Sequence, residues 1–521
     1  MKPQEQGVLV EIPEQPANES VKAEDSSSPK LKPIDRQQGL LRTVIVEELV
    51  PQNHKVRAIW DLTGRLDLSG FLQKIKSQEG RSGRAAWDPR LLLSVWLYAY
   101  SEQVTSAREI EALMEYEPGL MWLAGLGEVN HHTLSDFRAA HPAELKKLLS
   151  ELLGLLSKEG FVTLECVAHD GTKIRAQAGA DSFRREQTLE REIERARQMV
   201  EELDQESATE GSGDARRQAA RRRAAEERQA NLKRAAEELK KVRAAKGSAE
   251  ERAEARVSLT EPEARNMKHG DNAYAPSYNV QASTDVAHAI VVGVELTQCS
   301  SDGEALLPAM DNLKETVGQY PKQVVADGGF TNQGSIAGMQ EREIDFYGSL
   351  PELEVKQRAA MKSQGIDPEF SPAAFKIIGE RQTLECPDGK TLQYVRHSKK
   401  DGNAYHQYQA QGSDCAACQF RQRCCPGHAE QGRTVSIRIS EKALTAEFRA
   451  KMKTEEAQQI YRKRGATAEF PFSWIKEKLG IRKFRLRGLA KATTEAVWAI
   501  LTYDVMQWER LSWRPKVAAA A

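Results

Sequence analysis

The run Phe161-Val-Thr-Leu-Glu-Cys-Val-Ala-His-Asp170 is where the helical periodicity of the preceding residues gives way to strand-forming residues. Valine, phenylalanine and threonine favour β-strands. The pair Asp170-Gly171 follows at once, and Asp-Gly is a common turn signal. We therefore predict a strand that ends at Asp170, with residues 172–176 either continuing it or turning back.

Downstream of this run, strand patterns recur at 278–283, 289–297, 323–327 and 344–348. Helical patterns lie at 303–317 and from Thr331 onward, and a last helix carries Glu469. This order, with three strands before the first helix, matches the ribonuclease-H-like topology. We predict an α/β ribonuclease-H-like core with a mixed sheet, whose first part is 159–182 and 262–350 and whose end is 436–514.

A helical insertion is predicted at 183–261, where the chain has almost no aromatic residues and is dense in Arg, Glu and Ala. Apolar residues there step by three and four, which is heptad spacing and favours a coiled-coil-like antiparallel hairpin. Its positive and negative charges nearly balance. This balance favours a solvated spacer over a DNA-binding arm.

An all-α domain is predicted at 38–158, after a disordered tail at 1–37 that is rich in Pro, Gln, Glu and Ser. Pro89 begins a helix after Asp88, a suitable N-cap, and Ser106 with Glu109 fits a capping box. The domain suits DNA binding or dimerisation, and a purely structural helical cap fits the pattern equally well. Residues 515–521 are expected to be a short tail.

The overall composition gives no bulk attraction to nucleic acid, because 75 basic and 75 acidic side chains leave the 521-residue chain with a net charge of zero. Any DNA affinity must come from local patches. The chain shows no signal peptide and no apolar run of membrane-spanning length. With an odd number of cysteines, seven, it fits a reducing compartment, so we expect a soluble cytoplasmic protein.

A cysteine-rich insertion is predicted at 351–435, and it suggests a structural zinc site. Zinc takes four thiolate or imidazole ligands, and Cys415-Ala-Ala-Cys418 places two sulfurs on one short segment. Cys386 and Cys424 would complete the set, although Cys425 or His428 fits the fourth position as well. The alternative is a group of reduced free thiols.

Three carboxylates are the candidate catalytic residues. Asp170 and Asp327 each close a predicted strand and are followed by glycine, and in the predicted sheet their strands are neighbours. Phosphodiester cleavage with two metal ions needs such converging acidic ligands, and oxygen ligands select Mg²⁺ or Mn²⁺. Glu469 lies in a basic segment: residues 461–491 carry ten Lys or Arg and two Glu.

Taken together, these motifs resemble those of the DDE transposases of bacterial insertion sequences, in the IS4/IS5-like superfamily, and most closely the IS1182 family. The resemblance rests on His169-Asp-Gly-Thr-Lys-Ile-Arg-Ala176, on Val325-Ala-Asp-Gly-Gly-Phe330 and on the block from Tyr461. That block resembles the signature Tyr-x2-Arg-x3-Glu-x6-Lys, but four residues rather than three separate Arg464 from Glu469. This departure leaves open whether Arg462 or Arg464 contacts DNA.

The resemblance implies DNA cleavage at terminal inverted repeats and strand transfer into target DNA. Asp170, Asp327 and Glu469 would hold Mg²⁺ or Mn²⁺, and Zn²⁺ would be structural. The protein would act on double-stranded DNA as a homodimer, associated with the nucleoid. Residues expected to contact DNA are Tyr461, Arg464, Lys476, Arg482, Lys483 and Trp474, the last of which fits either base stacking or the core.

Two other functions fit the same residues. One is a catalytically inactive relative that only binds DNA. The other is a metal-dependent nuclease that cuts without strand transfer. The presence of all three carboxylates argues against the first, and the basic segment and the N-terminal helices argue against the second.

Overall fold

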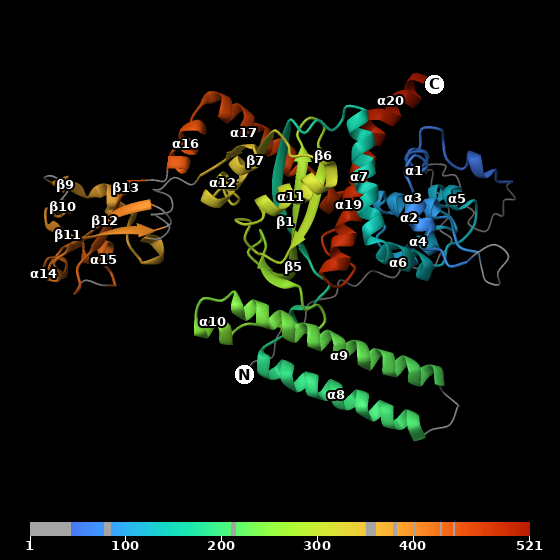
Figure 1. Ribbon diagram of the computed structural model, residues 1–521, viewed down its shortest axis with the longest axis horizontal. Helices are drawn as coiled ribbons and strands as arrows, with labels where there is room; N and C mark the ends of the chain where they lie inside the picture. The colour runs from blue at the N-terminus through green and yellow to red at the C-terminus, as the bar shows by residue number, and fades with distance from the viewer. Residues whose placement is uncertain are drawn as a thin grey trace, which may run out of the picture. The chain divides into compact units, whose positions relative to one another are not determined.

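The computed structural model describes residues 43–77, 85–209, 215–350, 361–378, 383–400, 403–427, 430–440 and 443–520. The predicted tail at 1–37 lies outside these residues. Figure 1 shows the elements in chain order, coloured from the N-terminus to the C-terminus. None of the helices in the described residues combines the length and the apolar character that a membrane crossing requires.

The main sheet is mixed, as predicted (Figure 1). Its strands run in the order β4-β5-β1-β7-β8, and β6 also pairs with β5. β1 is antiparallel to β5 and parallel to β7, and β7 is parallel to β8. The strands are β1 (Cys166–Arg175), β4 (Arg265–Lys268), β5 (Tyr274–Asp285), β6 (Ile290–Thr297), β7 (Gln323–Ala326) and β8 (Asp345–Gly348).

Of the two alternatives predicted for residues 172–176, the structure shows continuation of the strand, and the strand begins at Cys166 rather than at Phe161. β1 continues to Arg175, and Asp170 and Gly171 pair with Ala282 and Gln281 of β5. The turn signal fails here because a long partner strand satisfies the backbone hydrogen bonds on both sides of the Asp-Gly pair. The pairing of β1 with β7 stops at His169, so β1 extends six residues beyond the last residue that pairs with its parallel neighbour.

Helices cover the two faces of the sheet. α17 (Glu455–Ala468) packs on β1, β7 and β8, while α11 (Leu306–Val317) packs on β6 and β5. Buried Ala457, Ile460 and Ala468 of α17 contact Ala168 of β1 and its neighbours. The remaining helices of this part are α12 (Gln333–Glu341), α16 (Ala443–Lys451), α18 (Phe470–Glu477), α19 (Leu489–Trp508), η5 (Glu509–Trp513) and α20 (Arg514–Ala520).

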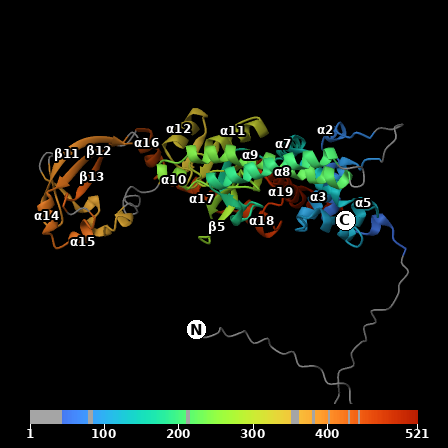
Figure 2. The same ribbon diagram turned by 90° about the horizontal axis from the view of Figure 1, so that it is seen from below.

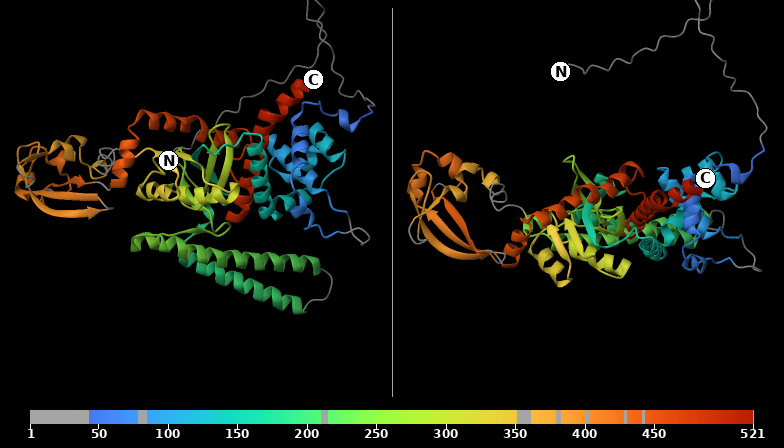
Figure 3. Two further views of the ribbon diagram at one scale, coloured as in Figure 1. Left: turned by 45° about the horizontal axis from the view of Figure 1, so that its top comes forward. Right: turned by 90° about the horizontal axis from the view of Figure 1, so that it is seen from above.

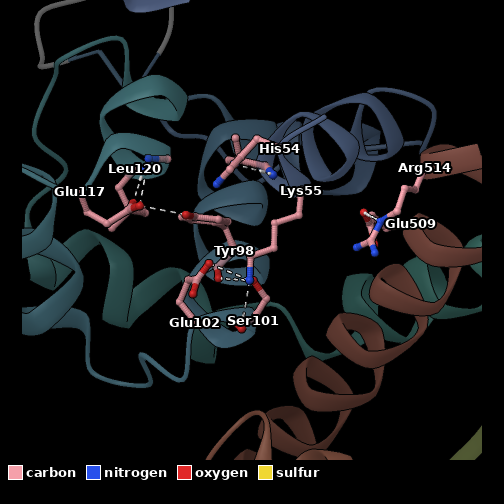
Figure 4. Close-up of polar contacts among 11 residues, drawn as sticks. His54, Lys55, Tyr98, Ser101, Glu102, Glu117, Leu120, Glu509 and Arg514 are labelled. Carbon is pink, nitrogen blue, oxygen red and sulfur yellow. Dashed lines mark hydrogen bonds and ion pairs between the residues drawn. The ribbon is translucent and has the colours of Figure 1, made fainter. Parts of the chain in front are cut away.

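The N-terminal part is helical, as predicted. Asp88 caps α3 by accepting a hydrogen bond from the Arg90 amide, but the Ser106 side chain makes no capping bond, so the predicted capping box is wrong. Figure 4 shows Glu117 accepting hydrogen bonds from Tyr98 and from the start of α5. The elements are η1 (Val46–Glu48), α1 (Lys55–Thr63), α2 (Ser69–Leu72), α3 (Pro89–Ser101), α4 (Ala107–Leu113), α5 (Pro118–Ala124), α6 (His131–Ala140) and α7 (Pro142–Lys158).

The N-terminal helices and the sheet share one hydrophobic core, and α19 joins them. α19 packs on β6 as well as on α3 and α7. Its buried Trp498 lies against the rings of Trp96, Tyr100 and Phe137, and its indole nitrogen donates to the Arg138 carbonyl. The described residues of the predicted N-terminal domain, 43–77 and 85–158, therefore share the core of the main sheet.

Two long helices, α8 (Glu186–Thr209) and α9 (Ala215–Ala244), lie side by side (Figures 1 and 2). In the sequence they follow the short strand β2 (Phe183–Arg184) and precede β3 (Val257–Ser258), which pairs with β2. The heptad residues Leu189, Ala196, Leu232 and Leu239 are buried between them. Ion pairs of Arg228 with Glu192 and of Arg222 with Asp204 give the antiparallel register. Nearby are η2 (Ala180–Ser182) and α10 (Ala249–Ala253).

The cysteine segment forms a second, antiparallel sheet with the order β13-β12-β11-β10-β9, drawn in orange in Figure 3. We did not predict these strands. The last of them extends beyond residue 435, to Ser440. The elements are η3 (Pro368–Phe370), η4 (Pro372–Ala374), β9 (Lys376–Ile378), β10 (Thr383–Glu385), β11 (Thr391–Lys400), β12 (Asn403–Ala410), α14 (Gly412–Ala416), α15 (Arg421–Cys424) and β13 (Thr434–Ser440).

Candidate active site

Asp170 lies in β1, and Asp327 directly follows β7, the parallel neighbour of β1, at the same level. His169 of β1 is opposite Ala326, the last residue of β7, so the next residue of each strand is an aspartate. Each carboxylate is held by a nearby backbone amide: Oδ1 of Asp170 accepts from Gly171 at 2.8 Å, and Oδ1 of Asp327 accepts from Gly329 at 2.7 Å. The sheet therefore brings these two predicted residues together.

Glu469 lies at the junction of two helices rather than inside one. α17 ends at Ala468 and α18 begins at Phe470, with Pro471 in the first turn of α18. Proline has no backbone N–H to donate to a preceding carbonyl, which favours a helix start at this point. The Glu469 side chain is exposed, at the end of the helix that covers β1 and β7.

The pKa of Asp170 reflects its acidic surroundings. Burial, together with the negative charges of Asp327 and Glu469, raises this pKa to about 6, although the Gly171 amide and the Arg464 guanidinium act in the opposite direction. Like charges at close range disfavour ionisation, and a divalent cation relieves that repulsion. The acidic oxygen donors thus suit a hard cation such as Mg²⁺.

The described residues nevertheless contain no group of three or more His, Cys, Asp or Glu side chains arranged closely enough to hold a metal ion. This holds for Asp170, Asp327 and Glu469 and also for the cysteines. The strand register, which depends on the backbone and not on side-chain rotamers, nevertheless brings Asp170 and Asp327 to the same level of the sheet.

Two basic side chains flank Asp170. An Arg464 nitrogen lies 3.8 Å from Asp170 Oδ2, and the side chains are only 20% and 16% exposed. Lys476 of α18 donates a hydrogen bond to the Thr172 hydroxyl, two residues along β1, and burial lowers its pKa. By contrast, Arg462 is exposed. Arg464 is thus the arginine that faces the carboxylates.

The other residues predicted to contact DNA lie along β1. Tyr461 packs on the cluster that contains Ala168, next to the Asp170 position. Arg482 and Lys483 are exposed, and their backbone runs beside Arg175 at the end of β1. Arg482 also forms an ion pair with Glu477.

Trp474 is half-buried, and its ring packs edge-on against Tyr503 with centroids 5.2 Å apart. This arrangement favours the core role over base stacking. The aromatic side chain that remains accessible beside Glu469 is Phe470, which is 45% exposed. We did not predict Phe470, although its position next to a candidate catalytic glutamate was visible in the sequence.

A buried polar network behind β1 is a second feature that sequence reasoning missed. His169 is fully buried, and its two ring nitrogens lie 3.0 Å from Ser283 Oγ and 3.0 Å from Gln281 Oε1. Burial lowers the pKa of His169 to about 4, so the imidazole is neutral at pH 7. The available signal was the alternation of Asn279, Gln281 and Ser283 with Val280 and Ala282 along β5.

The cysteines of the second sheet gather around one small cavity of about 30 Å³. Backbone amides donate to three of the sulfurs: Lys390 to Cys386, Phe420 to Cys418 and Arg433 to Cys415. Burial raises the pKa of Cys415, Cys418 and Cys424. All seven thiols are free, and His428, the alternative ligand, lies outside the described residues. The cavity is lined by Cys386, Cys415, Cys418, Cys424 and Cys425 among others.

Comparison with known families gives two matches. Residues 44–140 match a transposase domain (DUF772), and residues 385–507 match a transposase DDE domain. Glu469 lies inside the second match, while Asp170 and Asp327 lie outside both. No curated protein matches the chain.

Proposed function

By its two matched domains the chain is a DDE transposase of an insertion sequence, and we propose that it cuts DNA at the terminal inverted repeats and joins the ends to target DNA. This pair of domains is typical of the IS1182 family. The observation that supports this most is the register of β1 and β7, which sets Asp170 level with Asp327. The strand order β6-β5-β1-β7-β8, with β5 antiparallel to β1, supports a ribonuclease-H-like core.

In this proposal Asp170, Asp327 and Glu469 hold Mg²⁺ or Mn²⁺. Bound divalent ions supply Lewis-acid activation of the attacking oxygen and stabilisation of the leaving oxygen in phosphodiester chemistry. The chain's own contribution is positional: two strands fix the aspartates, and the helix junction presents the glutamate. The Gly171 and Gly329 amides orient one oxygen of each aspartate.

The basic side chains around the carboxylates grip the DNA backbone. Arg464 and Lys476 flank Asp170, so each can contact a phosphate beside the scissile bond, with arginine able to bind two phosphate oxygens. Tyr461, Arg482 and Lys483 extend the contact, and Trp474 supports the site from the core. Binding through phosphates weakens steeply with added salt.

The second sheet holds a structural zinc ion in this proposal, through Cys386, Cys415, Cys418 and Cys424. The gathered thiols and the amide donors on three sulfurs support it, because such donors stabilise thiolates. Zinc bound there would cross-link a small sheet with little core of its own. Cys425 remains the alternative fourth ligand.

Two DNA ends must meet before joining, so we propose a homodimer on double-stranded DNA at the nucleoid. The domains at 38–158, 183–261 and 351–435 would serve end recognition, spacing and zinc-dependent stabilisation. The exposed side chains of α8 and α9 carry charges of both signs, consistent with a solvated spacer.

A strand-transfer assay tests the proposal. The full chain is incubated with linear DNA of the element's own ends, a supercoiled target and Mg²⁺, beside Asp170→Asn, Asp327→Ala and Glu469→Gln. We expect each variant to lose cleavage and joining by a factor of 100 or more. Variants that cut and join like wild type would overturn the site, a wild type that cuts without joining would be a nuclease, and one that only binds would be an inactive relative.

A further inference from the structure

Asp302 lies in the turn between β6 and α11 and accepts two side-chain hydrogen bonds from β5. Its Oδ1 accepts from Asn279 Nδ2 at 2.7 Å and from Gln281 Nε2 at 2.9 Å. A carboxylate accepts only, so the Gln281 amide nitrogen faces Asp302 and its carbonyl oxygen faces His169 Nε2. Asp302 is thereby connected to the residue that precedes Asp170.

This arrangement also sets the tautomer of His169. Because Gln281 presents its carbonyl oxygen, the Nε2–H of His169 donates to it, and Nδ1 accepts from the Ser283 hydroxyl at 3.0 Å. We call this chain of hydrogen bonds from Asp302 through Gln281 and His169 to Ser283 the relay. Every member has a partner, and fully satisfied buried networks fix the position of the strands that carry them. Here those strands are β1 and β5.

Asp302 also lies close to Gly171, which follows Asp170, and to Gly329, two residues after Asp327. A Cβ on Gly171 would lie 2.9 Å from Asp302 Oδ1, and a Cβ on Gly329 would lie 3.9 Å from Asp302 Cβ. The same turn is tied to the chain after Asp327, since Asn332 Nδ2 donates to the Gly303 carbonyl at 2.6 Å. Asp302 thus lies between Gly171, within β1, and the residues that follow β7, on the face of the sheet opposite Asp170.

Helix capping does not explain this carboxylate. α11 begins at Leu306 with Ala305 as its N-cap, and no side chain makes a capping bond there. Nor does Asp302 share the face of Asp170. Side chains alternate along β1, so Gly171, which Asp302 contacts, faces the opposite side of the sheet from Asp170.

We propose that Asp302 is a positioning residue for DNA cleavage, which holds Asp170 and Asp327 at a fixed separation through Gln281, His169 and the two glycines. This inference rests on the proposed function, in which those aspartates hold divalent cations. Residues that orient metal ligands typically change metal affinity or activity by 10–100-fold when replaced. Asp302 would act in that way without touching the DNA.

The test measures Mn²⁺ binding to the full metal-free chain by the loss of the free-ion electron paramagnetic resonance signal. We expect Asp302→Ala to weaken Mn²⁺ binding by roughly 10-fold or more. Asp302→Asn, which keeps an acceptor oxygen for Asn279 and Gln281, should weaken it less. Asp311→Asn is the matched control on α11, because Asp311 pairs with Arg342 outside the relay, and it should bind like wild type.

Asp170→Asn and Asp327→Asn in the same assay separate this inference from the proposed function. If these two lose Mn²⁺ binding while both Asp302 variants bind like wild type, the role of Asp302 is overturned and the metal site stands. If the two retain wild-type binding, the metal site itself is refuted. Should Asp302→Ala not fold, Asp302→Asn decides: a Mn²⁺ affinity equal to that of Asp311→Asn overturns the inference.

Discussion

Replacing Asp170 with asparagine is expected to stabilise the metal-free protein near neutral pH while it abolishes catalysis. The Asp170 carboxyl is buried beside two other acids, and its pKa rises from 3.8 to about 6 on folding. A carboxyl with a raised pKa binds more protons in the folded state, so stability falls as the pH rises through this window. Asparagine removes that loss because it has no charge.

The size of the effect follows from the same values. Each pH unit between 3.8 and about 6 lowers the free energy of unfolding of wild type by about 1.4 kcal/mol, so above pH 6 the loss is about 3 kcal/mol. Asparagine keeps an oxygen for the Gly171 amide, so that hydrogen bond is retained. Arg464 loses a partner at 3.8 Å, which makes 3 kcal/mol an upper bound.

The assay is thermal unfolding of wild type and Asp170→Asn in EDTA. At pH 4 the melting temperatures should be close, whereas at pH 7.5 the variant should melt higher. Added Mg²⁺ should then raise the melting temperature of wild type and leave the variant unchanged. Asp311→Asn should instead melt lower than wild type at pH 7.5, because the hydrogen bond from Arg342 lowers the pKa of Asp311 and so stabilises the folded protein when this carboxylate is ionised. A variant that melts no higher than wild type at pH 7.5 would refute the reasoning.

Four further outcomes follow from single positions. Gly465 lies within α17 with open space around a Cβ, so Gly465→Ala should add roughly 0.5–1 kcal/mol to the free energy of unfolding, and an unchanged urea midpoint would contradict this. Gly171→Ala should abolish cleavage, because its Cβ would lie 2.5 Å from the side-chain nitrogen Nε2 of Gln281; an active variant would count against this packing. Burial raises the pKa of Asp504 well above its usual range, so wild type should lose stability relative to Asp504→Asn as the pH rises from 4, and parallel melting curves would exclude this. Metal analysis should find about one zinc per chain in wild type and in Cys299→Ala, whose thiol is exposed, and none in Cys418→Ala. Zinc retained in Cys418→Ala would contradict this site, and its absence from all three proteins would return the thiols to the free state.

Much of the main sheet could be predicted because its strands have a local signal. β6 and β7 are rich in β-branched residues and end near the predicted positions. β1 was predicted less well, since whether Asp170-Gly171 turns or continues depends on β5, more than a hundred residues later. A long-range partner overrode a short-range turn signal.

The candidate site was predictable only in part, for a similar reason. Asp170, Asp327 and Glu469 stand out because each has unusual neighbours in the sequence. Asp302 has none, and its role emerges only when β5 and the turn before α11 meet behind β1. The strands of the second sheet were also missed, because the cysteines dominate that segment and β11 and β12 alternate only weakly between apolar and polar residues, although β13 alternates regularly.

Trp498 of α19 has a consequence for damaged copies of the gene. A copy that loses its 3′ end would encode the N-terminal helices without α19, leaving the rings of Trp96 and Tyr100 without their cover. Such a fragment would expose an apolar surface that favours aggregation and proteolysis. Truncated copies of this gene would therefore not be expected to yield a stable fragment of the N-terminal helices.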